Sequence, residues 1–544
     1  MIKNNELTAK LYVNMIVSGA NNLQNNKEKI NALNVFPVPD GDTGTNMAAT
    51  IFSSTKNLKN ETFTHLGEVA KLISKNMLIE ARGNSGVILS QIFRGFSEYF
   101  LDKSVANNFE IVEAFISATK KAYDSVLQPV EGTLLTVIRE TTETLEKTVT
   151  PKTTIEELFK IALNAARKSC DNTPNILPIL KEVNVTDSGG EGLFLILEGM
   201  YNFLIGKPVE ISQSQNNVTN FVSDTEIYDG EFGYCTEVIV ELRNPKNFSK
   251  KRLISKIINF SSSLVVVRDS NIVKVHGHVL KPGKFLSAIQ QFGEFLKIKS
   301  ENMSLQANSS KIIAENETQN KKFKNAIISC NTGQGIINIM KENGAHFIIE
   351  GGQTNNPSIR DILNAIDSLE AENIFFLPNN SNIILSAQQA VQTITNKNVI
   401  IIPSKTPIQG INAVLNFSED ISWQENKELM EDAIKSIHTI EVTQANRDVK
   451  IGDVKIKNEE FIGILNGEIL VSTSNYIDAA KSTIKILMKN IGENSSDLIS
   501  IYYGVDSSEG DAKELADFIE ANYDVEIEIK KGEQKTYHFL IGVE

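Results

Sequence analysis

The spacing of apolar residues changes twice along this chain, and these changes constrain the fold more than any other feature of the sequence. From residue 7 to about residue 206, apolar residues recur at helical spacing. In "TTIEELFKIALNAARKSC", for example, Thr154 and Glu157 form a capping box ahead of an apolar helix face. Strand-like alternation is nearly absent here. The sequence therefore predicts an all-helical N-terminal domain over residues 1–208.

The pattern then becomes mixed. Between about 225 and 300 it reads strand, helix, strand, strand, helix, strand, which predicts a small α+β middle domain of the ferredoxin-like class over 225–302. After it, short buried-type strands alternate with helices, which is typical of a parallel sheet. We expect an α/β C-terminal domain with a parallel sheet and an α+β tail over 322–544. The polar stretches 207–226 and 301–322 are the predicted linkers of this multidomain chain.

Composition excludes several classes of protein. The chain carries 54 Lys and Arg against 67 Asp and Glu, a formal charge of −13, and no segment concentrates basic residues, so we expect no nucleic-acid partner. No apolar run is long enough to cross a bilayer, and the first residues lack the pattern of a secretory signal, which predicts a cytoplasmic protein with no transmembrane segment. The three cysteines, Cys170, Cys235 and Cys330, are widely spread and indicate a reducing compartment. We expect Cys170 and Cys330 to be core thiols.

The stretch "NVFPVPDGDTGTNM" places Asp40 and Asp42 around a glycine, immediately before a predicted helix. A glycine-permitted turn can bring two carboxylates close together, and oxygen ligands suit a hard cation such as Mg²⁺. The free N–H groups at the start of the next helix would lie beside them, and such an end binds anions. The spacing excludes an EF-hand, and the chain has no Walker A motif. The structural alternative is a solvent-exposed Pro-Asp-Gly turn at the surface.

The middle domain contains residues that could bind a second metal, although their spacing alone favours no metal site. Strand alternation in "NIVKVHGHVL" puts His276 and His278 on one face, and Cys235 begins another strand with Glu237 on its own polar face. A Cys/His/His set suits Zn²⁺, and Glu237 or water could supply a fourth ligand. The alternative is an edge strand carrying two histidines, with an unrelated thiol elsewhere.

Four N-terminal motifs resemble the ATP-binding domain of the dihydroxyacetone-kinase superfamily: "NVFPVPDGDTGTNM", "ARGNSGVILSQIFRGF", "EGTLLTVI" and "VTDSGGEGL". With "YCTE", "VKVHGH", "IEGGQTNNPS", "LPNNSNIILSAQQA" and "YHFLIGVE", the chain resembles the bacterial fatty-acid kinase catalytic subunit essentially end to end. The resemblance implies a helical barrel that binds ATP and two Mg²⁺ ions. It also favours Zn²⁺ binding by Cys235, His276 and His278. It further implies phosphoryl transfer to the carboxylate of a fatty acid presented by a separate fatty-acid-binding protein. The product would be an acyl phosphate for phospholipid synthesis, and we expect a homodimer.

The resemblance also implies roles for particular residues. Asp40 and Asp42 match catalytic, metal-ligating aspartates, and Asn34 stands near the position of a third, acidic Mg²⁺ ligand. The phosphate-side turn is matched by Thr43, Gly44, Thr45 and Asn46. The small-residue loop over the phosphates is matched by Gly83, Asn84, Ser85 and Gly86. Two positions near the nucleotide are matched by Thr133 and Asp187. Two structural alternatives stay open: "GNSG" could be only a helix-start turn, and Asp187 could be a helix N-cap.

The predicted mechanism needs no general base. The only histidine of the first domain is His65, which lies in none of the motifs, and a carboxylate acceptor with a pKa of about 4 is already ionised at pH 7. Catalysis then reduces to positioning and to neutralising phosphate charge. Two other functions remain as alternatives: a kinase for a small hydroxyl substrate such as dihydroxyacetone, and a nucleotide-sensing scaffold without turnover.

The family resemblance also implies that the C-terminal domain recruits the partner protein. Ligands of an open parallel sheet dock at the carboxyl ends of its strands. Those ends carry polar residues, with structural helix capping as the alternative role: Asn331, Thr332, Gln353, Thr354, Asn379, Asn380, Ser404 and Lys405.

Overall fold

The computed structural model describes residues 6–34, 41–55, 58, 63–126, 128–183, 185–211, 234–258, 261–269, 271–279, 281–302, 322–353, 355–445, 448–451, 453–492 and 496–544. These fall into two compact units, one formed by 1–220 with 322–544 and the other by 221–321. Most of both predicted linkers, and Asp40, lie outside the described residues. The three separate domains with the boundaries given above stay a prediction.

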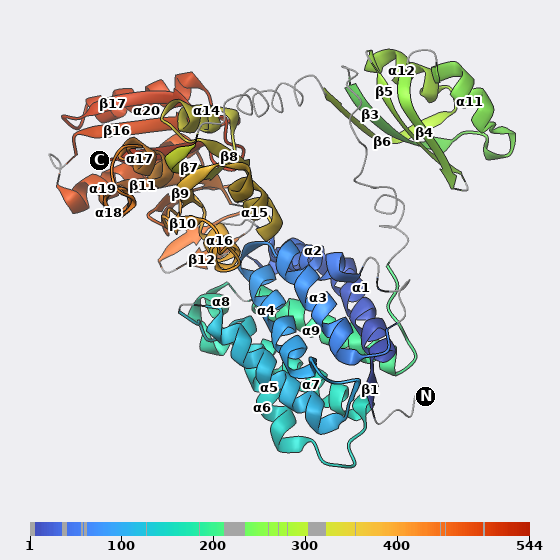
Figure 1. Ribbon diagram of the computed structural model, residues 1–544. Helices are drawn as coiled ribbons and strands as arrows, with labels where there is room; N and C mark the ends of the chain where they lie inside the picture. Colours follow the sequence, from blue (N-terminus) through green and yellow to red (C-terminus); the bar gives the residue numbers. More distant parts are fainter. Residues whose placement is uncertain are drawn as a thin grey trace. The chain divides into compact units, whose positions relative to one another are not determined.

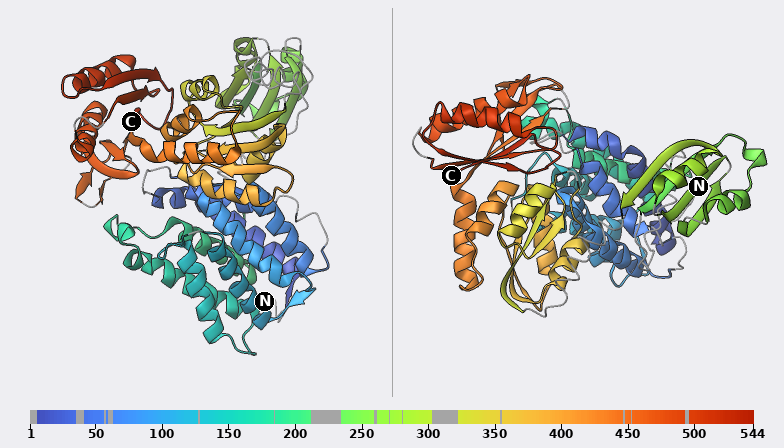
Figure 2. Two further views of the ribbon diagram at one scale, coloured as in Figure 1. Left: turned by 60° about the vertical axis from the view of Figure 1, so that its left-hand side comes forward. Right: turned by 90° about the horizontal axis from the view of Figure 1, so that it is seen from above.

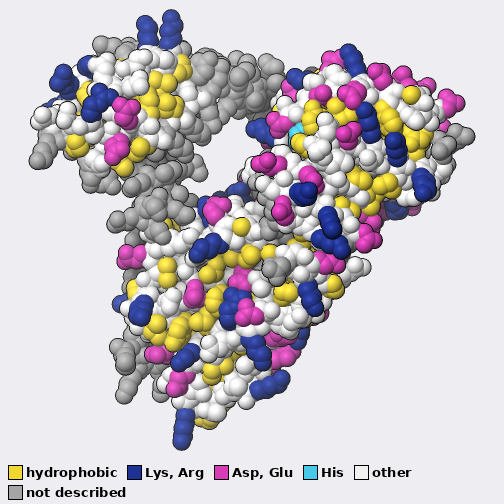
Figure 3. Space-filling model, turned by 180° about the vertical axis from the view of Figure 1, so that it is seen from behind, with side chains coloured by type: hydrophobic (Ala, Val, Ile, Leu, Met, Phe, Trp, Pro, Cys, Tyr) yellow, Lys and Arg dark blue, Asp and Glu magenta, His cyan; other side chains and the backbone are white. Residues whose placement is uncertain are grey.

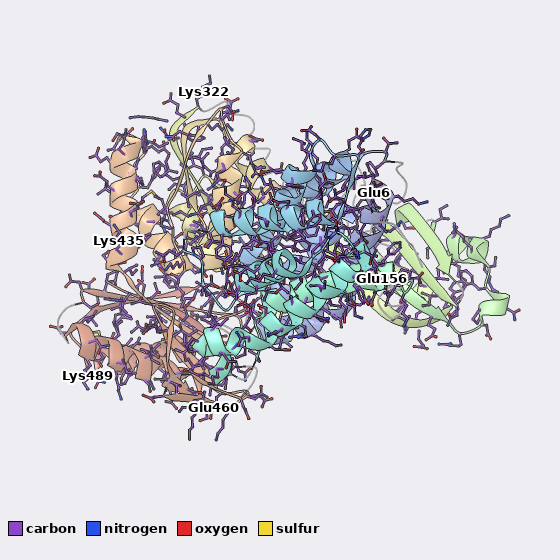
Figure 4. The ribbon with its side chains drawn as sticks, turned by 90° about the horizontal axis from the view of Figure 1, so that it is seen from below. Glu6, Glu156, Lys322, Lys435, Glu460 and Lys489 are labelled. Carbon is purple, nitrogen blue, oxygen red and sulfur yellow. The ribbon has the colours of Figure 1, made fainter. Side chains whose placement is uncertain are left out.

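The N-terminal region is helical, as predicted (Figure 1). Its elements are β1 (Leu7–Thr8), α1 (Ala9–Leu33), α2 (Thr43–Thr55), α3 (Leu66–Glu80), α4 (Gly83–Phe100), β2 (Val105–Ala106), α5 (Asn108–Asp124), α6 (Leu134–Thr148), α7 (Ile155–Ile176), α8 (Pro178–Glu182) and α9 (Ser188–Leu204). The predicted capping box begins α7, where the Glu157 N–H donates to Thr154 Oγ1 over 3.2 Å and Thr154 N–H donates to Glu157 Oε2 over 2.9 Å. Glu156, in the first turn of this helix, is labelled in Figure 4.

The helices contact one another in a circuit that runs from α1 through α9, α7, α6, α5 and α4 to α2 and back to α1. Figure 2 gives two further views of these helices lying along one another. Their apolar faces form one core, in which Tyr12, Phe100 and Phe115 are almost fully buried. Cys170 is buried in this core, as predicted. The circuit places the start of α2 beside α4 and α9, and the barrel class itself stays a prediction.

The middle unit has the predicted order of elements. They are β3 (Tyr234–Leu242), the short 3₁₀ helix η2 (Pro245–Asn247), α11 (Lys250–Ile257), β4 (Ser261–Asp269), β5 (Ile272–Val279), α12 (Pro282–Gln290) and β6 (Gly293–Asn302). Its four strands form one antiparallel sheet in the order β4-β5-β3-β6. Val238, Val275 and Phe285 belong to its apolar core. The ferredoxin-like class stays a prediction.

The C-terminal region contains the predicted parallel sheet, with strand order β10-β9-β7-β8. Its elements are β7 (Phe323–Asn331), α14 (Gln334–Glu342), β8 (Phe347–Glu350), α15 (Ile359–Ser368), β9 (Ala371–Leu377), α16 (Ser381–Gln392), β10 (Asn398–Ile401), α17 (Pro407–Leu415) and α18 (Trp423–Ser436). Cys330 is buried near the end of β7, as predicted. Figure 4 labels Lys322, just before β7, and Lys435, near the end of α18.

A second, mixed sheet follows, in the order β15-β14-β11-β18-β16-β17, and it is larger than the predicted tail. Its strands and helices are β11 (His438–Gln444), β14 (Phe461–Leu465), β15 (Glu468–Thr473), α19 (Tyr476–Ile491), β16 (Leu498–Tyr503), α20 (Glu509–Glu520), β17 (Glu526–Lys531) and β18 (Phe539–Val543), with a small hairpin of β12 (Val449–Ile451) and β13 (Val454–Ile456) beside it. The last strand, β18, lies between β11 and β16, so the end of the chain completes this sheet.

No described helix is long and apolar enough to cross a membrane. On the face of the molecule drawn in Figure 3, basic and acidic side chains are interspersed, and no broad basic patch is visible there.

Candidate phosphate and metal site

Helices from distant parts of the sequence bring their N-terminal ends together in the helical region. The Ser188 hydroxyl, at the start of α9, donates to Thr43 Oγ1 at the start of α2 over 3.2 Å. Gly83, which begins α4, lies so close to α2 that a Cβ on it would stand 2.5 Å from Asn46 Nδ2. Each of these ends carries N–H groups without an intrahelical partner and the positive end of a helix dipole. Together they provide an environment that favours an anion.

Asp187 joins a further helix to this group. Its carboxylate accepts the Gly190 N–H at the start of α9 over 2.7 Å, and it also accepts the backbone N–H of Leu134, the first residue of α6. Burial raises the pKa of Asp187 to about 6, while these backbone donors act in the opposite direction. Asp187 is therefore the N-cap that one alternative predicted, and it links the starts of α6 and α9.

Asp42 lies immediately before α2, where its backbone carbonyl accepts the Asn46 N–H over 2.8 Å. Its side chain is only 7% exposed, so the expectation of a solvent-exposed turn at the surface is wrong for this residue. Burial raises the pKa of the Asp42 carboxyl, and hydrogen bonds from the side chains of Asn46 and Asn356 lower it. The preceding Gly41 has a φ of +53°, a left-handed conformation that favours glycine.

The "GNSG" segment is a helix start, as its structural alternative predicted, and it is closely packed. Gly83 has a φ of +57°. A Cβ on Gly86 would stand 2.5 Å from Thr50 Oγ1, so α2 and α4 can approach one another this closely only with glycine here. Asn84 is exposed, and its side chain donates to Asn382 of α16 over 3.4 Å.

The remaining predicted residues line the same region or lie at its edge. Thr133 is the N-cap of α6, and Asn34 is the C-cap of α1. Thr45 N–H donates to Asn31 Oδ1 over 3.0 Å, so Asn31 fixes the first turn of α2 against α1. A Cβ on Gly44 would stand 2.2 Å from the carbonyl oxygen of Lys27, which lies in α1 as Asn31 does. Asn31 was not predicted from the sequence, because it has no motif of its own.

Asn356, which comes from the C-terminal region, was not predicted from the sequence either. Asn356 Nδ2 donates to Asp42 Oδ2 across a sequence separation of 314 residues. The side chain is only 2% exposed. The only local signal was its place in "GGQTNNPS", a turn-forming segment that follows β8 and leads into α15.

Asn356 belongs to a broader contact between the helical and C-terminal regions of the first unit. The Ile359 N–H donates to the Ala81 carbonyl over 3.2 Å, and Gln91 Nε2 donates to Gln389 Oε1 over 3.2 Å. Ala81 and Val87, on either side of the "GNSG" segment, are buried in the apolar core that covers one side of the parallel sheet. The C-terminal region thus packs directly against the start of α4.

A cavity lies at the carboxyl ends of the parallel strands, and its walls include the polar residues Asn331, Asn379 and Gln534. Much of this polarity has a structural role. Asn379 Nδ2 donates to Ser329, to the Cys330 carbonyl and to Asn331, and Asn380 is the N-cap of α16. Whether a partner docks here stays a prediction.

The register of the middle sheet places Cys235 directly opposite His278, and Glu237 directly opposite His276. The side chains of all four lie outside the described residues. Among the side chains that are described in the structure, no group of three His, Cys, Asp or Glu residues could hold a metal.

Comparison with known proteins gives the family. Residues 37–202 match the DAK2 domain, 231–310 match the middle domain of FakA-like fatty acid kinase subunits, and 326–544 match their C-terminal domain. The chain is 39% identical to Protein YloV of Bacillus subtilis, over 99% of both chains. It is 38% identical to an uncharacterized protein of Staphylococcus aureus strain MRSA252, over 99% of this chain and 100% of the relative.

Two solved structures illustrate partial similarity. One is the dihydroxyacetone kinase from C. freundii in complex with AMP-PNP and Mg²⁺, with 20% identity, a TM-score of 0.30, and coverage of 36% of this chain and 34% of that one. The other is a Thermotoga maritima protein described as having a fatty acid binding function, with 12% identity, a TM-score of 0.32, and coverage of 41% and 99%. Over its whole length, this chain belongs to the FakA-like fatty acid kinase family, whose N-terminal part is a DAK2 domain.

Proposed function

We propose that this protein is an ATP-dependent kinase that phosphorylates the carboxylate of a fatty acid held by a separate binding protein. The observation that carries the proposal is the meeting of helix N-termini beside the buried Asp42 carboxylate, in a chain of the FakA-like fatty acid kinase family. The matched domains are described as those of a kinase subunit, which favours a second protein as the source of the acyl group.

In this proposal, oxygen ligands hold Mg²⁺. Asp42 and Asp40 are the metal ligands, with Asn34 near the third position, and the all-oxygen set suits Mg²⁺. The metal would neutralise charge on the ATP phosphates. Asp42 fits this role because its carboxylate is buried among amide donors, where a cation would offset the cost of keeping it ionised.

The backbone N–H groups of the helix starts then act on the phosphates. The segments proposed to hold them are Thr43 to Asn46 and Gly83 to Gly86, with Thr133 and Asp187 nearby. The N–H groups of Thr45, Asn46 and Gly86 already donate within the protein, to Asn31, Asp42 and Arg82, so the other N–H groups of these segments are the proposed phosphate donors. Fixed donors of this kind stabilise the charge of the transferring phosphoryl group without reorganising.

The proposed reaction forms one bond and breaks one. A carboxylate oxygen of the fatty acid bonds to the γ-phosphorus of ATP, and the bond from that phosphorus to the bridging oxygen breaks, which gives acyl phosphate and ADP. No proton has to be removed from the acceptor, because a carboxylate is already ionised at neutral pH. His65, the only histidine before residue 276, is exposed ahead of α3 and needs no part in this step.

The test is to purify the full chain with its co-purifying proteins and to assay ATP-dependent acyl phosphate with and without them. Acyl phosphate that forms only with the lipid-loaded partner supports the proposal. Phosphorylation of dihydroxyacetone instead would favour the small-molecule kinase, and nucleotide binding without turnover would favour the scaffold.

We also propose that Cys235, His276 and His278 bind one Zn²⁺. The strand register, which sets Cys235 opposite His278 and Glu237 opposite His276, supports a shared site on one face of the sheet. Protein purified without chelator should contain about one zinc per chain, and His276→Ala should lower that content. Lys274→Ala, on the same strand, is the matched control and should keep the zinc. Folded wild-type protein without zinc would contradict this assignment.

A further inference from the structure

In the side-chain amide of Asn356, the nitrogen has a hydrogen-bond partner and the oxygen has none among the described residues. Its Nδ2 donates to Asp42 Oδ2. Its Oδ1 is fully buried and has no hydrogen-bond partner among the residues that the structure describes. A buried carbonyl oxygen without a partner is costly, so such an atom calls for an explanation such as an unseen ion or water.

The backbone holds Asn356 in this place from both sides. Before it, Gly352 and Asn355 form a β-bridge. After it, Ser358 is the N-cap of α15 and forms a capping box, in which the Ser358 N–H donates to Asp361 Oδ2 over 2.8 Å. The next residue, Ile359, donates its N–H to Ala81 of the helical region over 3.2 Å. Asn356 therefore reaches Asp42 from a segment that makes backbone hydrogen bonds both before and after it.

We propose that Asn356 is a positioning residue of the metal and phosphate site, supplied by the C-terminal region. Its Nδ2 fixes the Asp42 carboxylate, and its Oδ1 is an oxygen donor toward the hydrated Mg²⁺ that Asp42 binds. This inference rests on the proposed function, because it takes Asp42 as a metal ligand. It makes the C-terminal region a part of the nucleotide site in addition to its expected role in docking a partner.

The Gln91–Gln389 pair is a contact between the same two regions in which both side chains are partnered. Gln389 lies in the same contact, is 6% exposed, and pairs with the buried Gln91 over 3.2 Å. Neither of these glutamine side chains has a fully buried atom without a partner. Gln389 therefore provides the matched control for Asn356, since both amides bridge the same two regions and only Asn356 touches Asp42.

The test measures binding of Mg²⁺ with ADP to the full chain, by calorimetry and by the shift in melting temperature across a Mg²⁺ titration. Asn356→Ala should weaken the Mg²⁺-dependent binding of ADP by about 10-fold to 100-fold, the usual effect of losing a group that orients a metal ligand. Asn356→Asp keeps the oxygen that corresponds to Oδ1 but loses the Nδ2 donor to Asp42, so its Mg²⁺-dependent binding of ADP should fall by less than the ~10-fold lower limit expected for Asn356→Ala. Gln389→Ala should bind Mg²⁺ and ADP as wild type does.

Three results would overturn the inference: wild-type binding by Asn356→Ala, an equal loss in Gln389→Ala, or a loss in Asn356→Asp as large as that in Asn356→Ala. If Asn356→Ala does not fold, Asn356→Asp and Gln389→Ala still decide the question. A wild-type chain that binds no Mg²⁺ and ADP would instead remove the proposed function. If the wild-type chain binds Mg²⁺ and ADP and Asn356→Ala binds them equally well, only this inference is removed and the proposed function stands.

Discussion

Asp42 is buried, accepts hydrogen bonds from amide groups and lies beside several helix starts. Substituting it tests whether its carboxylate binds a metal or has only a structural role. Asp42→Asn keeps the size of the side chain and an oxygen that can accept from Asn356. Because burial already raises the pKa of Asp42, losing the charge should leave the melting temperature unchanged or higher. Phosphoryl transfer should fall about a thousandfold, or roughly 4 kcal/mol. The exposed Asp102→Asn is the control, and wild-type activity in folded Asp42→Asn would refute the metal assignment.

Glu441 makes the stability of the C-terminal region depend on pH. Its side chain is 8% exposed, and burial raises its pKa from 4.5 to about 7 against a hydrogen bond from Tyr537. The neutral form is favoured in the fold, so its stabilising effect is complete below pH 4.5 and is lost as the pH rises through about 7. The loss amounts to roughly 3 kcal/mol, at about 1.4 kcal/mol per pKa unit.

Glu441→Gln should therefore flatten the pH dependence of the unfolding free energy between pH 5 and 8, and it should exceed wild type in stability at pH 8. Urea unfolding at several pH values measures this. The exposed Glu526→Gln should leave the pH dependence as it is. A wild-type pH profile in Glu441→Gln would show that Glu441 is ionised in the fold.

At the scale of elements, the contact between α2 and α4 depends on Gly86. A methyl group there would meet the fully buried Thr50 Oγ1, which is itself held by a 2.7 Å hydrogen bond to the Asn46 carbonyl. Gly86→Ala should therefore lower the unfolding free energy by ~1–3 kcal/mol. Gly510→Ala, in α20, meets only Ser508 Oγ at 3.5 Å and should be neutral or stabilising. Equal melting temperatures for Gly86→Ala and wild type would contradict this packing.

Most elements could be predicted because their signals are local. The capping box of α7, the glycine-permitted turn at Gly41 and the four strands of the parallel sheet each follow from a few neighbouring residues. One local signal was overlooked: Asn466 and Gly467, with φ of 50° and 91°, form the turn between β14 and β15. That hairpin and β11 make the mixed sheet larger than the predicted tail.

At the scale of the whole molecule, the site depends on contacts that no local pattern encodes. Asp42 was predicted from its motif, but its burial by Asn356 arises only when residues 314 apart meet. The same holds for Ser188 and Thr43, which bring α9 to α2. The helical and C-terminal regions of the first unit share a contact at the start of α4, and this arrangement makes the phosphate site a product of both.

The central claim is that the acceptor is a fatty-acid carboxylate, and one measurement tests it most directly. The full chain is incubated with ATP, Mg²⁺ and its lipid-loaded partner, and hydroxylamine traps any acyl phosphate as a hydroxamate. The proposed function predicts one fatty hydroxamate per ADP formed, with none in Asp42→Asn. ADP formed without hydroxamate, or as much hydroxamate from folded Asp42→Asn as from wild type, would contradict it.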